Sequence, residues 1–123
     1  MTIEKILLVE DDPDQLQALK MMISALFPQA QVLAMADGFN ALALAPQFQP
    51  DAIITDVAMP QADGLSFLHA LLPQLRKMPH LLVLTAYDRQ QLQRIGPLPE
   101  QAQFLQKPIT VATLTAAIAD WFG

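Results

Sequence analysis

The feature that most constrains the fold of this 123-residue chain is a regular alternation of short apolar runs with longer amphipathic stretches. Short apolar runs bounded by polar residues are typical of strands, and apolar residues at helical spacing are typical of helices. Because a right-handed crossover puts a helix between successive parallel strands, five such pairs predict a doubly wound α/β sheet with helices on both faces. The predicted strands are 5–9, 31–35, 52–55, 81–84 and 103–105, and the predicted helices are 13–27, 38–44, 65–75, 89–95 and 111–122.

Local signals support several of these boundaries. Asp12 followed by Pro13 is typical of an N-cap and the first helical position, and Thr110 is a suitable cap for the last helix. Pro73 interrupts the helical pattern of 65–75, and the proline-containing segment 95–100 is expected to shorten the helix before it.

Length and composition fit one domain over residues 1–123, because 53% of the residues are hydrophobic and can fill one core. A net charge of −5 has the wrong sign for binding nucleic-acid phosphates. The lack of Cys excludes disulfides, thiolate metal sites and a Cys nucleophile, and it favours a cytoplasmic location. The apolar runs are too short to span a membrane, and the N-terminus has no export signal pattern.

Polar residues stand where the predicted strands end. In a parallel sheet these ends meet at one edge, where ligands bind. Three carboxylates close together need a counter-charge, and an oxygen-only set of ligands favours Mg²⁺ or Mn²⁺, with a lysine supplying further positive charge. The residues at this edge are Glu10, Asp11, Asp12, Asp56, Thr85 and Lys107.

This set of residues suits phosphoryl chemistry. An aspartate beside a divalent cation and a lysine is prepared to attack phosphorus, so Asp56 is the expected nucleophile. Lys107 would neutralise the phosphoryl oxygens, and the Thr85 hydroxyl would donate a hydrogen bond to one of them. Taken alone, Asp12 is better explained as a helix cap and Asp11 as a solvated neighbour, but the company of Asp56 and Lys107 reverses this and favours a metal site.

The chain resembles the receiver domain of bacterial two-component response regulators over essentially its whole length. The sequence Leu-Val-Glu-Asp-Asp at 8–12 is similar to the acidic metal-binding segment, and Ile-Thr-Asp-Val-Ala-Met-Pro at 54–60 is similar to the phosphoacceptor strand and its loop. Thr85-Ala86 resembles the switch hydroxyl, Lys107-Pro108 the lysine before a cis-prone proline, and Phe104 the rotating aromatic.

The resemblance implies a flavodoxin-like fold with strand order 2-1-3-4-5 and a signalling switch rather than a metabolic enzyme. Asp56 would accept a phosphoryl group from a histidine kinase or a histidine phosphotransfer protein, followed by self-catalysed hydrolysis. The metal ligands would be Asp11, Asp12, Asp56 and the backbone carbonyl of Ala58, and the switch residues Thr85 and Phe104. Output through 89–95, 103–105 and 111–122 would reach a downstream protein, an attached output domain or a second copy, with no role for nucleic acid or membrane.

Two positions depart from the more polar choices often seen in this family, namely Ala58 and Tyr87. Because an alanine side chain cannot orient an attacking water, we expect slow autodephosphorylation. Three other readings stay open: a degenerate receiver that acts only as an interaction module, a Mg²⁺-dependent phosphohydrolase, and a flavodoxin-like ligand module. The last two fit less well, because a hydrolase would want a second acid near Asp56 and a ligand module would want a phosphate-cradling loop after 5–9.

Overall fold

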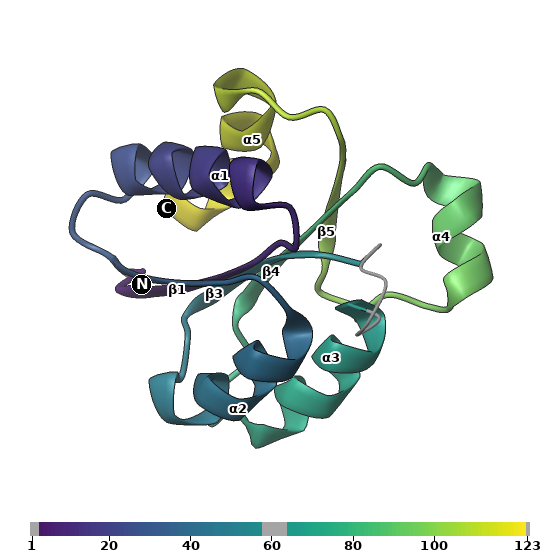
Figure 1. Cartoon of the computed structure of the whole chain (residues 1–123), viewed down its shortest axis with the longest axis horizontal. Helices are drawn as coiled ribbons and strands as arrows, with labels where there is room; N and C mark the ends of the chain where they lie inside the picture. The colour runs from purple at the N-terminus through teal and green to yellow at the C-terminus, as the bar shows by residue number, and fades with distance from the viewer. Residues whose placement is uncertain (1–2, 58–63, 123) are drawn as a thin grey trace.

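The computed structural model describes residues 3–57 and 64–122, and its centre is a parallel sheet. The strand order is β2-β1-β3-β4-β5, which confirms the expected doubly wound topology (Figure 1). Every neighbouring pair of strands is parallel. The strands are β1 (Lys5–Val9), β2 (Gln31–Met35), β3 (Ala52–Asp56), β4 (His80–Thr85) and β5 (Gln103–Gln106).

Helices cover both faces of the sheet, with α1 and α5 on one side and α2 and α3 on the other (Figure 1). Each face has its own buried apolar cluster, one packed under α1 and α5 and the other under α2, α3 and α4. The helices are α1 (Pro13–Leu26), α2 (Gly38–Phe48), α3 (Gly64–Leu71), α4 (Arg89–Ile95) and α5 (Val111–Ala117), with 3₁₀ turns η1 (Leu72–Gln74) and η2 (Ala119–Phe122).

The central strands are buried on both faces, as their uninterrupted apolar sequences predict. Alternate residues point to opposite faces, so Ile6 and Leu8 join the cluster under α1 and α5, while Leu7 and Val9 join the other. Each fully buried Leu or Ile contributes about 1.5–3 kcal/mol relative to exposure. The same alternation decides which polar residues meet beyond the strand ends.

Three helix ends differ from the sequence prediction. Helix α2 continues past the expected end at residue 44 and includes Pro46, which costs it only one backbone hydrogen bond in its last turn. Helix α3 ends at Leu71, short of residue 75, and the turn η1 follows from Leu72, so Pro73 interrupts the helical pattern as expected. The last predicted helix stops at Ala117, and the tighter turn η2 brings the Trp121 indole N–H to Gln103 Oε1 at 2.9 Å.

Other predicted boundaries are confirmed. Asp12 caps α1 with Pro13 at the first helical position, and Thr110 caps α5. Helix α4 ends at Ile95, and its C-cap Gly96, whose φ of +127° favours glycine, stands just before Pro97. Within the described ranges, no helix is long and apolar enough to cross a membrane.

Candidate functional site

The site lies at the carboxyl edge of the sheet, where β1, β3, β4 and β5 end. Asp56 and Thr85 are the last residues of β3 and β4, so each strand ends one residue later than predicted, and β4 also begins one residue earlier, at His80. Lys107 follows β5 directly, and its backbone N–H donates to Thr85 O at 2.7 Å. The Lys107–Pro108 peptide is cis. The register therefore brings Asp56 and Lys107 together and places Thr85 at the end of the neighbouring strand.

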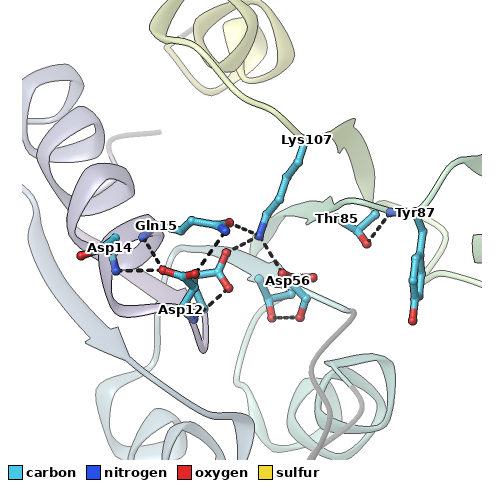
Figure 2. A network of polar contacts seen from close by, with 9 residues as sticks. Asp12, Asp14, Gln15, Asp56, Thr85, Tyr87 and Lys107 are labelled. Carbon is cyan, nitrogen blue, oxygen red and sulfur yellow. Dashed lines mark hydrogen bonds and ion pairs between the residues drawn. The ribbon is translucent and has the colours of Figure 1, made fainter.

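Lys107 is the hub of the polar network (Figure 2). Its ammonium donates to Asp56 Oδ2 at 2.8 Å, to Gln15 Oε1 at 2.5 Å and to Glu10 Oε1. Only 16% of its side chain is exposed. An ammonium carries three protons, so these three acceptors use its full donor capacity.

Three carboxylates gather beside this lysine. Oxygens of Glu10, Asp11 and Asp56 all lie within 4.8 Å of one another, and Glu10 and Asp56 are buried. They line an open cleft of about 490 Å³ that also borders Lys107 and Ala86. Clustered carboxylates with no sulfur or imidazole suit a hard cation such as Mg²⁺, which would be held with several waters in such an open cleft.

The cluster differs from the expected ligand pair of Asp11 and Asp12. Asp12 stands outside it, because its Oδ1 accepts from the backbone N–H groups of Asp14 at 2.9 Å and Gln15 at 3.1 Å and so caps α1. Glu10 stands in its place. The expected carbonyl ligand, Ala58, lies outside the described residues.

Strand parity explains why Glu10 belongs to the site. Ile54 and Leu8 face the α1 and α5 side, so Asp56 and Glu10, each two residues further along, face the same side. Glu10 also continues the sheet, because its N–H donates to Met35 O at 3.1 Å. Counting alternate positions from the predicted strand would have found Glu10; the sequence reasoning placed it at this edge but gave it no role.

Burial and charge oppose each other in this cluster. Burial raises the pKa of the Glu10 carboxyl above its ordinary value and the Asp56 charge adds to this, although Lys107 acts in the opposite direction. Burial alone would lower the pKa of the Lys107 ammonium, but its hydrogen bonds to Asp56 and Glu10 raise it. Lys107 is therefore held in its charged form, and this one ammonium is set against three carboxyl groups, a set of donors that a bound cation would complement.

Thr85 and Phe104 lie on the other side of the sheet from Asp56. Thr85 is fully buried, and its Oγ1 accepts from the Tyr87 backbone N–H at 3.1 Å. Phe104 pairs with Val83 in the sheet register and packs partly buried against the cluster under α2, α3 and α4. The Arg89 guanidinium lies over the Phe104 ring, 5.3 Å from its centroid.

The fold and the site together define a class of protein. The family model described as the response regulator receiver domain matches residues 6–119, and the chain belongs to that family. Members of this family are signalling switches of two-component systems rather than classical enzymes. Receiver domains bind Mg²⁺ at an acidic pocket, and response regulators interact with histidine kinases and output domains.

Particular relatives show the extent of the likeness. The chain is 35% identical over 115 residues to response regulator MprA of Mycobacterium leprae, covering 93% of this chain and 49% of that protein. It is 32% identical over 118 residues to transcriptional regulatory protein PrrA of Mycobacterium tuberculosis, covering 96% and 49%. The chain thus spans about half the length of these curated relatives. Among solved structures, the Vibrio cholerae chemotaxis protein CheY4 is similar, with a TM-score of 0.77 and 28% identity over 97% of this chain and 98% of that one.

Proposed function

We propose that this chain forms a single receiver domain that accepts a phosphoryl group on Asp56 from a phosphohistidine of a histidine kinase or phosphotransfer protein. The observation that carries the proposal is the buried Asp56 carboxylate held 2.8 Å from the Lys107 ammonium, beside Glu10 and Asp11. In the transfer, an Asp56 oxygen forms a bond to phosphorus while the phosphorus–nitrogen bond breaks. The nitrogen keeps that electron pair and takes a proton from solvent.

Each neighbouring residue has a role in this transfer. Glu10, Asp11 and Asp56 would hold the cation, Mg²⁺ or Mn²⁺, and a bound cation supplies positive charge that offsets the phosphoryl oxygens. Lys107 supplies a second positive charge at the same place, already oriented by Asp56. The Asp12 carboxylate keeps its capping role and supports the site by fixing the start of α1.

The switch would follow from the contacts of Thr85 and Phe104. Moving the Thr85 hydroxyl toward a phosphoryl oxygen requires it to release the Tyr87 N–H. Phe104 lies on the same face of the sheet, opposite Val83 in β4, so its ring can fill the space that the Thr85 side chain leaves once the ring separates from Arg89. The two arrangements are packed states, and phosphorylation would shift the population between them.

The output surface would be formed by α4, β5 and α5. Arg89 is the first residue of α4, Phe104 lies in β5, and α5 is the next helix in the chain. We propose that this surface binds a downstream protein, an attached output domain or a second copy of the chain. A cytoplasmic location, favoured by the lack of Cys, belongs to the same proposal.

The proposal is tested by intact mass after incubation with acetyl phosphate and Mg²⁺. We expect a single phosphoryl increment, lost in an Asp56→Asn variant and lost when EDTA removes the cation. No increment in the wild-type chain would favour a degenerate receiver that acts only as an interaction module. An increment that survives Asp56→Asn would place the acceptor elsewhere.

A further inference from the structure

Gln15 occupies a helix position where a glutamine side chain normally accepts a hydrogen bond from the backbone N–H of the N-cap residue. It is the third residue after the N-cap Asp12 in α1, and Gln91 is the third residue after the N-cap Asp88 in α4. Gln91 completes a capping box, because its Oε1 accepts the Asp88 N–H at 2.8 Å. In α1 the Gln15 carbonyl oxygen instead accepts from the Lys107 ammonium at 2.5 Å.

The orientation of the Gln15 amide is dictated by its neighbours. A lysine ammonium can only donate and a carboxylate can only accept, so the carbonyl must face Lys107 and the NH₂ must face Asp12. The structure has this arrangement, with Gln15 Nε2 3.5 Å from Asp12 Oδ2 (Figure 2). The side chain therefore links the cap of α1 to Lys107.

Gln15 also stands between two clefts. On one side is the acidic cleft of about 490 Å³ that contains Asp56, and on the other a cleft of about 550 Å³ with mostly apolar walls, which include Leu19 and Ile109. Both clefts are bordered by Gln15 and Lys107. If the Gln15 side chain releases Lys107, it can therefore move into either cleft without displacing core residues.

We propose that Gln15 is a positioning residue that holds the Lys107 ammonium before phosphorylation and yields its place to a phosphoryl oxygen on Asp56. The inference rests on the proposed function. All three Lys107 protons are already used, by Glu10, Gln15 and Asp56, so a phosphoryl oxygen must displace one acceptor. Of the two acceptors that do not themselves take up the phosphoryl group, Gln15 is the one displaced, because the charge-assisted hydrogen bond to the Glu10 carboxylate is stronger than one to a neutral amide.

The first experiment compares Gln15→Met with wild type in the rate of phosphorylation by acetyl phosphate in Mg²⁺. Methionine has a similar size but no amide. The cap of α1 is retained, because Asp12 accepts from the backbone N–H groups of residues 14 and 15 and not from the Gln15 side chain alone. We expect the variant to react about 3- to 10-fold faster, the equivalent of one modest hydrogen bond that no longer has to break. Gln91→Met, which loses a glutamine at the same helix position away from the site, should react at the wild-type rate.

The second experiment reads the contact without any phosphoryl transfer. The NMR signals of the Gln15 side-chain NH₂ group should shift in a Lys107→Met variant of the unphosphorylated chain, while those of Gln91 should not. Phosphorylation of the wild-type chain should move the Gln15 signals in the same direction, since both changes release the amide from Lys107.

The outcomes separate the two claims. Gln15 signals that do not respond to Lys107→Met, or a Gln15→Met variant that reacts at or below the wild-type rate, would overturn the role of Gln15 while leaving Asp56 as acceptor. A wild-type chain that accepts no phosphoryl group would refute the proposed function and the yielding of Gln15 together. Even then, the NMR comparison of the unphosphorylated wild-type and Lys107→Met chains would decide whether Gln15 positions Lys107.

Discussion

Removing the Lys107 charge should destabilise the metal-free chain by an amount that the site geometry sets. In Lys107→Met, the buried Glu10 and Asp56 carboxylates stay within 4.8 Å of each other without their shared counter-charge. At that separation and an effective dielectric constant of about 20, two unit charges repel by about 3.5 kcal/mol. Breaking a buried ion pair by removing one partner typically costs about 3–5 kcal/mol. We therefore expect a loss of about 3 kcal/mol in the free energy of unfolding at neutral pH.

The assay is urea denaturation in EDTA, with Lys77→Met as the matched control. Lys77 also pairs with an aspartate, Asp51 at 3.4 Å, but 61% of its side chain is exposed, so its removal should cost less than about 1 kcal/mol. Added Mg²⁺ should restore more stability to Lys107→Met than to wild type, because the cation would supply the missing charge.

The deficit of Lys107→Met should also depend on pH. Burial raises the pKa of Glu10, and losing Lys107 raises it further. An acid whose folded pKa is raised destabilises the fold when ionised, and this penalty disappears as the pH falls and the group takes up a proton. The difference between variant and wild type should thus shrink between neutral pH and about pH 5. A variant as stable as wild type in EDTA, or a deficit that does not change with pH, would refute this charge balance.

Asp51, Thr85 and Ala58 each offer a further test. Asp51→Ala should lose about 2 kcal/mol in urea denaturation, because Asp51 Oδ2 accepts the N–H groups of Glu4 at 2.9 Å and Lys5 at 3.0 Å. Although burial alone would raise it, these bonds and Lys77 lower the pKa of Asp51, so its contribution is present above about pH 4 and lost as the pH falls below that; a wild-type advantage that persists in acid would contradict this. Thr85→Ala should still take up a phosphoryl group in the mass assay but no longer couple it to Phe104, and an unchanged response of the Phe104 ring NMR signals would show that Thr85 is dispensable. The phosphorylated chain should decay slowly in Mg²⁺, because Ala58 offers no polar side chain to orient water, and fast decay that Ala58→Asn does not alter would refute this.

Much of the fold was predictable because its signals are local. The apolar runs and helix spacings define five strand and helix pairs, and chain chirality then leaves few ways to arrange them. The helix ends were less predictable: Pro46 lies inside α2, and η2 replaces the end of the last predicted helix. The end of the last helix depends on packing, because the buried Trp121 bonds to Gln103 in β5, which is distant in sequence.

The site was predictable where it depends on strand ends and less so where it depends on side-chain direction. Asp56, Thr85 and Lys107 lie at the predicted edge because parallel strands share it. The choice between Glu10 and Asp12 depends on which carboxylate joins Asp11 and Asp56 and which caps α1, and this is decided by strand parity and by where the helix begins. Gln15 carried no signal, since a glutamine at that helix position is ordinarily a capping residue.

The most direct test of the central claim is to locate the phosphoryl group chemically. An aspartyl phosphate is an acyl phosphate, which borohydride reduces to homoserine, and peptide mass spectrometry identifies the residue converted. After incubation with acetyl phosphate and Mg²⁺, we expect conversion at Asp56 alone, with none in EDTA. Conversion at Asp11, Asp12 or Glu10 in place of Asp56, or none in a chain that binds Mg²⁺, would contradict it.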